Sequence, residues 1–178
     1  MLPTLCYPVR RRETPDQPLD KPGSHDHSCR QSAAPGGTLP LVSDRGQAMY
    51  QERTRSIQIS VEPFYVDDQS VPEQNRFVFG YRIQIDNQGL ETVQLISRQW
   101  RITDGHGRTL EVRGAGVVGK QPILQPGESF EYTSGTPLST PSGIMVGSYQ
   151  METAAGERFD VAIPAFSLDA PGKPGSLH

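Results

Sequence analysis

The chain has 178 residues, of which 34% are hydrophobic and 21% charged, and its formal net charge is −3. This length fits one globular domain with an extension and excludes two domains of ordinary size. An isoelectric point near 5.8 argues against a nucleic-acid partner, and because no run of 18 apolar residues occurs we expect no membrane span.

The first 49 residues differ in composition from the rest of the chain. Seven of the 16 prolines precede Met49, but only one aromatic residue, Tyr7, does so. Such a segment cannot bury enough apolar surface to offset the entropy of ordering it, which predicts a disordered leader over 1–49. Two interpretations stay open: a solvated extension, or a translation start assigned too early, with Met49 as the native start.

Both cysteines of the chain, Cys6 and Cys29, lie in this leader. We therefore expect no disulfide in the domain, and without a secretory signal in residues 1–12 we expect a cytoplasmic protein. His25 and His27 stand close to Cys29, but a structural zinc site needs about four ligands, so a solvated tail is favoured. We expect no metal site and no cofactor.

From Ser56 onward apolar and polar residues alternate with the period of two that is typical of half-buried strands. Ile57 begins the first strand, and Pro63 ends it or marks a sheet edge. The later predicted strands are 77–85, 93–103, 109–112, 129–133, 144–153 and 159–163. Segments 114–127 and 134–142 each contain two prolines and are predicted loops.

The segment 93–103 contains the only tryptophan of the chain. Its alternation places Ile96, Trp100 and Ile102 on a buried face, where Trp100 is expected to be a core residue. Arg98 has the same parity, so it either extends to the rim of the core or pairs with a buried acid.

These strands and turns predict an all-β fold, an antiparallel β-sandwich of about seven to eight strands. The sandwich is expected to span residues 50–172, followed by a short tail at 173–178.

One motif of known chemistry occurs, the G-x-G-x-x-G sequence at 114–119. A dinucleotide site needs a helix directly after it, which Pro122 and Pro126 exclude. The glycines either form an anion-binding nest between two cations, or they serve a β-bulge or sheet crossing, which is the favoured interpretation. The residues of the candidate anion site are Arg113, Gly114, Gly116, Gly119 and Lys120.

No catalytic constellation assembles in residues 50–172. His106 is the only histidine there, and the motifs of zinc proteases and serine hydrolases are missing. We expect a protein that is not an enzyme and has no catalytic residues.

Several longer stretches resemble the ApaG family in one register over about residues 50–170. The stretches that carry the resemblance are 97–104, 112–122, 126–128, 132–135 and 140–151. The resemblance implies an immunoglobulin- or fibronectin-III-like form of this sandwich. It also implies an association with cobalt resistance and magnesium efflux, and relatives that act as protein-interaction modules.

Two functions remain open at this point. The first is a non-catalytic domain that binds an unidentified protein through a sheet edge or the loop 134–142. The second is a binder of pyrophosphate or a dinucleoside polyphosphate through the glycine motif, as the resemblance has suggested. The sequence leaves the choice between a monomer and a homodimer open.

Overall fold

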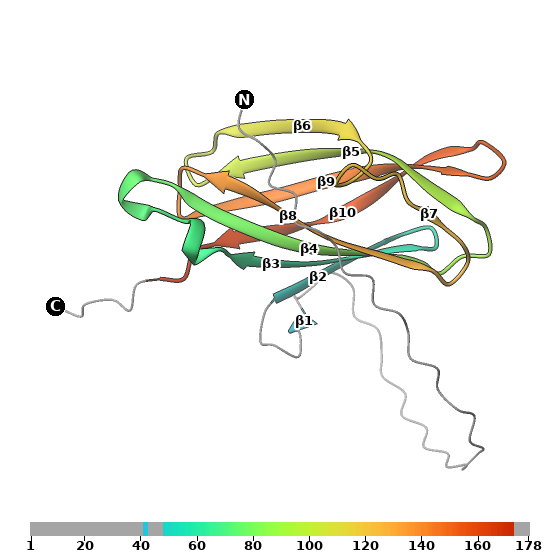
Figure 1. The fold of residues 1–178 in the computed structure, drawn as a ribbon, viewed down its shortest axis with the longest axis horizontal. Helices are drawn as coiled ribbons and strands as arrows, with labels where there is room; N and C mark the ends of the chain where they lie inside the picture. Colours follow the sequence, from blue (N-terminus) through green and yellow to red (C-terminus); the bar gives the residue numbers. More distant parts are fainter. Residues whose placement is uncertain (1–40, 43–47, 173–178) are drawn as a thin grey trace, which may run out of the picture. The chain divides into compact units, whose positions relative to one another are not determined.

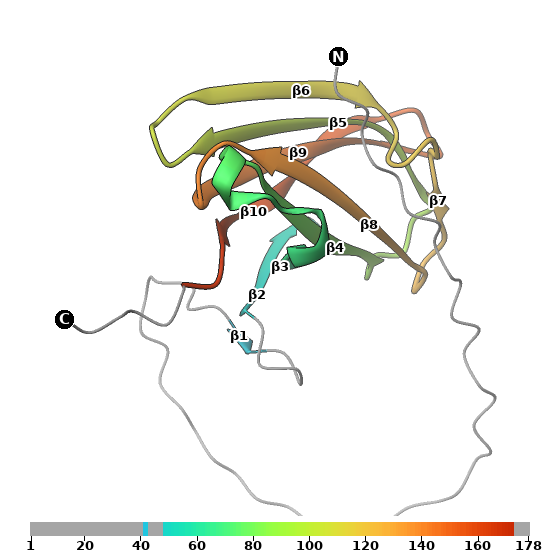
Figure 2. The same ribbon diagram turned by 60° about the vertical axis from the view of Figure 1, so that its left-hand side comes forward.

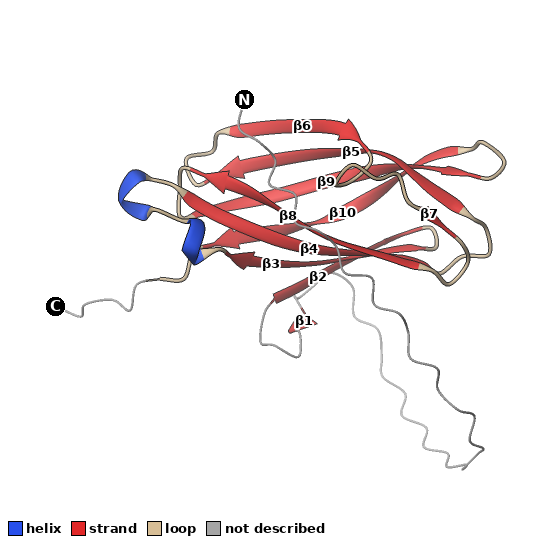
Figure 3. Ribbon diagram, in the orientation of Figure 1, coloured by secondary structure: helices blue, strands red, loops and turns tan. Residues whose placement is uncertain are grey.

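The structure is a computed structural model that describes residues 41–42 and 48–172. They form strands, shown in red in Figure 3, and two 3₁₀ turns, η1 (Asp67–Gln69) and η2 (Pro72–Gln74). The strands are β1 (Leu41–Val42), β2 (Ala48–Thr54), β3 (Ile57–Tyr65), β4 (Phe77–Asn87), β5 (Val93–Asp104), β6 (Thr109–Ala115), β7 (Ile123–Leu124), β8 (Ser129–Leu138), β9 (Ser142–Thr153) and β10 (Arg158–Asp169).

The strands form two antiparallel sheets that face each other (Figures 1 and 2). One sheet has the order β1-β2-β3-β4-β8, and the other has the order β10-β9-β5-β6, with β7 paired to the start of β5. Hairpins join β5 to β6 and β9 to β10, whereas the chain changes sheet after β4, β7 and β8. The predicted all-β antiparallel sandwich is confirmed.

The core lies between the sheets and is rich in aromatic residues. Trp100 is 2% exposed, which confirms its predicted place in the core. Its ring centroid lies 5.5 Å from that of Tyr81 in the opposite sheet and 6.0 Å from that of Phe166 in β10. Tilted and edge-to-face ring pairs of this kind add to the free energy of area burial. Trp100 therefore ties the two layers together.

The prediction of which residues of β5 face the core is wrong at the start of the strand. The register with β9 shifts between Leu95 and Ser97, so an extra residue stands at Ile96. Leu95 is 1% exposed, while Ile96, expected in the core, is only half-buried. A bulge inverts the parity of every residue before it, which the alternation pattern alone does not reveal.

The predicted loop 134–142 is also mostly wrong. β8 continues to Leu138 along β4, with Gly80 opposite Gly135 and Val78 opposite Pro137, which leaves a short connection at 139–141. Proline is tolerated there because β8 lies at the edge of its sheet. Pro63 fits the same rule, since β3 pairs with β2 only as far as Val61.

The leader differs from its prediction where the structure describes it. β2 begins at Ala48 and pairs with β3, and Met49 lies opposite Leu41 of β1. Residues 41–42 and 48–49 are therefore strand residues. The His25–Cys29 tract and the predicted tail 173–178 lie outside the described residues.

Candidate functional site

The glycine motif spans the end of β6 and the turn that follows it. Arg113 and Gly114 are strand residues opposite Gln99 and Arg98 of β5. Gly116 and Lys120 belong to a tight turn in which Val117 and Lys120 form an isolated bridge. Three positions of the turn have a positive φ, which favours glycine: φ is 57° at Gly116, 44° at Val118 and 76° at Gly119.

Most N–H groups of this turn donate to the protein itself. Gly116 donates to the carbonyl of Ile96 over 2.9 Å, and Val117 and Lys120 each donate to the carbonyl of the other over 2.8 Å. Only the N–H groups of Val118 and Gly119 have no acceptor among the described residues. An anion nest uses successive N–H groups that converge on one point, so this turn offers at most two.

Local packing and backbone conformation explain why glycines occupy these positions of the motif. A Cβ on Gly116 would stand 2.1 Å from the carbonyl oxygen of Lys120, and one on Gly114 would stand 3.1 Å from Nη1 of Arg98. A Cβ on Gly119 would meet nothing within 4 Å. Gly116 is thus needed for the close approach of two backbone segments, Gly114 lies in tight contact with the Arg98 side chain, and Gly119 supplies only a positive φ.

Arg98 lies beneath the turn and fastens it. Its Nη1 donates to the carbonyl of Gly116 over 2.6 Å and to that of Ala115 over 3.2 Å. Of the two alternatives considered from the sequence, the rim position is therefore found, with carbonyl oxygens as acceptors. Val117 beside it is 0% exposed and anchors the turn in the core.

A buried tyrosine pair lies close to Arg98. The hydroxyls of Tyr132 in β8 and Tyr149 in β9 are 2.5 Å apart, and this hydrogen bond crosses between the sheets. Burial raises the pKa of both phenols because it disfavours the phenolate. The positive charge of Arg98 opposes this rise at both tyrosines. The region beneath the glycine motif is thus a satisfied polar cluster rather than an open site.

The two cationic side chains that flank the motif, Arg113 and Lys120, have different surroundings. The Arg113 guanidinium lies 3.4 Å from a carboxylate oxygen of Glu111 on the same strand, and both side chains are exposed. Lys120 is exposed at the end of the turn. The structure thus brings Gly114 and Gly116 together around Arg98 and leaves Gly119 and Lys120 at the surface.

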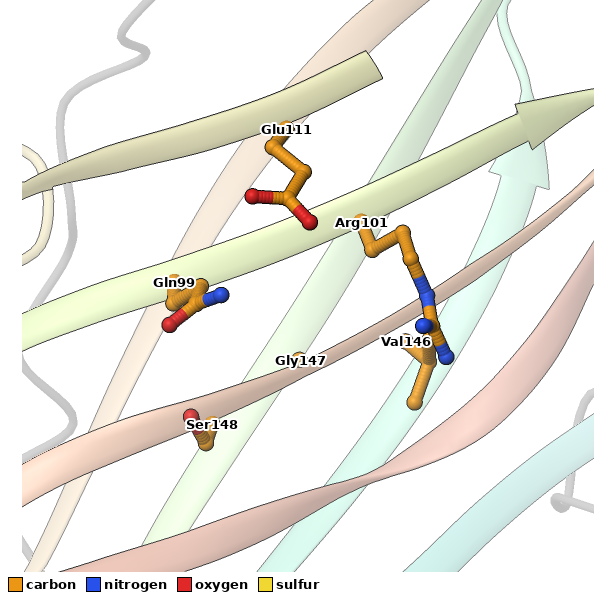
Figure 4. Close-up of a pocket in the computed structure, with 6 residues that line it drawn as sticks. All are labelled: Gln99, Arg101, Glu111, Val146, Gly147 and Ser148. Carbon is orange, nitrogen blue, oxygen red and sulfur yellow. The ribbon is translucent and has the colours of Figure 1, made fainter. Parts of the chain in front are cut away.

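A shallow hollow of about 210 Å³ lies on the outer face of the β10-β9-β5-β6 sheet. Figure 4 shows Glu111 on β6 above Gln99 and Arg101 on β5, with Ser148 on β9 below them. Gly147 and Val146 complete the lining. The hollow therefore presents a carboxylate, a guanidinium, an amide and a hydroxyl on one rigid sheet.

Sequence reasoning missed this hollow, although part of its signal was available. Gln99 and Arg101 alternate with buried Trp100, so they must face outward. The pairing of Gln99 with Ser148, and of Arg101 with Glu111, could not be read from the sequence because register is a long-range property.

A second hollow, of about 310 Å³, lies at one end of the sandwich. Its lining includes Ile57, Leu90 and Phe159, and the Arg55 guanidinium lies 4.4 Å from the Phe159 ring centroid. Arg55 also forms a 2.7 Å ion pair with Glu157. The polar side chains of its lining include Arg55, Asn87 and Thr153, and each of them already forms a hydrogen bond within the protein.

Within residues 41–42 and 48–172 no three His, Cys, Asp or Glu side chains gather into a metal-binding group. In the same part of the chain no helix has the length and apolar character needed to span a membrane.

These features define a two-sheet β-sandwich whose glycine motif belongs to the framework of the fold. The family model of the ApaG domain matches residues 67–153. Proteins named ApaG are similar along most of the domain: that of Rhodospirillum centenum is 65% identical over 123 residues, covering 69% of this chain and 95% of the relative. That of Paramagnetospirillum magneticum is 62% identical over 130 residues, covering 73% of this chain and 100% of the relative.

Solved structures agree with this relationship. The crystal structure of an ApaA protein from Bordetella pertussis is 51% identical, with a TM-score of 0.64 over 66% of this chain and 95% of the other. The X-ray structure of a structural genomics target is 46% identical, with a TM-score of 0.62 over 69% and 91% of the two chains. The chain belongs to the ApaG family.

Proposed function

We propose that this chain is a non-catalytic domain that binds another protein through the outer face of the β10-β9-β5-β6 sheet. The observation that carries the proposal is the hollow lined by Gln99, Arg101, Glu111 and Ser148. Its volume of about 210 Å³ is smaller than the roughly 300–1,000 Å³ of small-molecule pockets, but it is large enough for a side chain of a partner. The names of the relatives state no reaction.

Charge and rigidity support a protein partner. Arg101 and Glu111 are both exposed and stand opposite each other on paired strands. The surface therefore presents a positive and a negative side chain next to each other. A side chain on a strand interior is held more firmly than one on a loop, and arginine is enriched at protein interfaces. Paired charges of this kind select a partner with the complementary pattern.

The direct test compares two charge reversals of equal size. Arg101→Glu changes the hollow, whereas Arg76→Glu changes an exposed residue before β4 in the other sheet. Affinity-tagged full-length variants would be isolated from cells of the source organism, and co-purifying proteins would be compared by quantitative mass spectrometry. We expect a partner that the wild type and Arg76→Glu retain and Arg101→Glu loses.

The result must then be reproduced with the purified partner by calorimetry. A set of partners that is the same for all three proteins would overturn the proposed surface, provided that circular dichroism shows all three to be folded.

The alternative function is binding of pyrophosphate or a dinucleoside polyphosphate at the glycine motif. The N–H groups of Val118 and Gly119, next to exposed Lys120, favour it. Calorimetry with pyrophosphate and with diadenosine tetraphosphate tests it. Heat that disappears in Arg113→Ala and Lys120→Ala would support anion binding, and our primary proposal predicts no heat at millimolar ligand.

We further propose a cytoplasmic location, a fibronectin-III-like topology, and a link to cobalt resistance and magnesium efflux. The strand order β3-β4-β8 opposite β10-β9-β5-β6 supports the second of these. The third can be tested by cobalt sensitivity in a strain that lacks the gene. If the link passes through the protein partner, wild type and Arg76→Glu should restore growth and Arg101→Glu should not.

A further inference from the structure

The outer edge of β6 differs from the sheet edges at β8 and β10. Among the described strands β6 pairs only with β5, and Figure 2 shows it at the margin of its sheet. The opposite sheet ends at β8, which carries Pro137, and β10 carries Pro164 at a register shift. Proline and bulges block unwanted strand pairing at those two edges, and β6 has neither. Charged side chains can also block pairing, but the two on β6, Glu111 and Arg113, are of opposite sign.

The hydrogen-bonding groups of β6 follow a fixed alternation. Asp104 donates its N–H to the carbonyl of Arg108, and Gly116 donates its N–H to the carbonyl of Ile96, each over 2.9 Å. Because an antiparallel ladder alternates, the even residues between them direct their backbone groups to β5. The N–H and C=O groups of the odd residues Glu111 and Arg113 therefore point away from the sheet.

The geometry points to a second copy of this chain as the partner of β6. In an antiparallel two-fold pairing centred on Val112, Glu111 of each copy lies directly opposite Arg113 of the other. Both residues are odd, so their outward backbone groups form the new hydrogen bonds, and both side chains lie on the same outer face. This inference goes beyond the proposed partner binding and does not depend on it.

The charges favour this register over its neighbours. A shift of the two-fold axis by one residue would place Glu111 opposite Glu111, or Arg113 opposite Arg113, and like charges directly opposite each other are destabilising. With the axis at Val112 the row on the outer face alternates in sign, because Arg101 of β5 stands beside Glu111. The strand is thus complementary to itself, which an isologous interface requires.

The inner face of β6 agrees with the same pairing. Leu110 is 59% exposed, and Val112 is only half-buried, so this short strand carries apolar surface that the monomer leaves in water. In the two-fold arrangement Val112 lies opposite Val112, and Leu110 lies opposite Gly114 of the second copy. On this face the Arg98 guanidinium lies over Gly114, and burial of Val112 against its own copy favours association.

The first test measures association of the full-length protein by sedimentation velocity over a range of concentrations, with a reducing agent because Cys6 and Cys29 could cross-link. We expect a reversible dimer. Glu111→Arg and Arg113→Glu should each raise its dissociation constant at least about tenfold, and the double swap should restore it. A mixture of the two single variants should form a heterodimer, because all opposing charges then attract.

The second test reads the register directly. In a Cys6→Ser, Cys29→Ser background, Val112→Cys should cross-link two copies under mild oxidation, because a non-hydrogen-bonded pair has its Cα atoms about 4.5 Å apart, within disulfide reach. Leu110→Cys should not cross-link, because in this register residue 110 of one copy lies opposite Gly114 of the other. The two residues at position 110 are therefore displaced from each other along the strands. Arg76→Glu is the charge control, and thermal melting shows that each variant is folded.

The inference is overturned by a monomer at every concentration, by a dimer that both charge reversals leave unchanged, or by equal cross-linking at positions 110 and 112. Each of these outcomes is distinct from the loss of a protein partner in Arg101→Glu. The dimer and the partner surface can therefore fail separately.

Discussion

The two ends of β6 are both glycine-rich turns, but they differ in what surrounds the glycines. At the β5–β6 hairpin, Gly107 has φ of 81° and a Cβ there would meet nothing within 4 Å. At the other end, Gly116 has φ of 57° and a Cβ would stand 2.1 Å from a backbone oxygen. The first turn lies in solvent, whereas Val117 fixes the second in the core.

This comparison shows why the G-x-G-x-x-G spacing alone is a weak indicator of a ligand site. Glycine meets two separate requirements, a positive φ and a close approach of backbone, and the same letters occur for both. At Gly107 only the first requirement applies. At Gly116 both apply, and the N–H groups that could have held an anion close the turn instead.

The largest expected effect comes from Gly116→Ala. Left-handed strain of about 1–2 kcal/mol is joined by the displacement of the Lys120 carbonyl, so we expect a loss of about 3 kcal/mol or more in the free energy of unfolding. Gly107→Ala is the matched control, with strain but open space, and should cost about 1 kcal/mol. Urea unfolding of both variants measures the difference, and equal losses would contradict it.

Arg98→Met is expected to have the next largest effect. The change keeps most of the aliphatic stem but removes the hydrogen bonds to the carbonyls of Ala115 and Gly116, for a loss of about 2 kcal/mol. Arg101→Met, three residues along on the outer face, should change stability by less than about 0.5 kcal/mol. If the two substitutions cost the same, Arg98 does not fasten the turn.

The tyrosine pair beneath the turn should give a smaller loss at neutral pH. Tyr132→Phe leaves the Tyr149 hydroxyl buried without its partner, at a cost of about 1–2 kcal/mol, and replacement of both tyrosines should cost less than the sum of the single changes. A double-mutant cycle by urea unfolding measures this coupling. Strict additivity would mean that the hydroxyls do not interact.

The same pair predicts a loss of stability at alkaline pH. Burial raises the pKa of both phenols in the folded state above the ordinary value near 10. The stabilisation is therefore complete below about pH 10 and is lost as pH rises and the unfolded chain releases its phenolic protons. The double phenylalanine variant should lose less stability between neutral and strongly alkaline pH, which unfolding curves at the two values would show.

The sequence predicted most strands because alternation is a local signal, and residues such as Ile83 and Tyr149 lie on the predicted buried parity. It was misleading where a long-range contact decides the outcome. Pro137 suggested a loop, but an edge strand tolerates proline, and the bulge before Ser97 inverted the face of Ile96. β2 was missed because its sequence, AMYQERT, has little apolar alternation.

The candidate site was harder to predict than the fold. The motif residues were recognised, but the partners of their N–H groups, such as the Ile96 carbonyl, come from another strand. The hollow around Arg101 depends on which strands lie beside β5, and that neighbourhood is set by the crossings between sheets.

The smallest expected effect lies at the solvent-exposed turn, where Asp104 accepts the N–H groups of His106 and Arg108 as well as the Arg108 side chain. Partial burial would raise the pKa of this carboxyl, but these donors outweigh it and leave the pKa below its ordinary value. Its stabilisation is therefore present above about pH 4 and is lost as pH falls. Asp104→Asn should flatten the fall of the melting temperature in acid, which calorimetric scans at neutral and acidic pH measure.

Asp160→Asn, at an exposed carboxylate of β10, is the control and should keep the acid dependence of the wild type. If Asp104→Asn did so as well, the hairpin bonds would contribute nothing measurable. The hairpin would then be held by the β5–β6 ladder alone. If instead Asp104→Asn destabilised the protein as much as Gly116→Ala, the hairpin would be as essential as the turn anchored by Val117. The contrast between the solvent-exposed and the anchored glycine turn would then be wrong, because that contrast requires the acid effect to be small and confined to the hairpin.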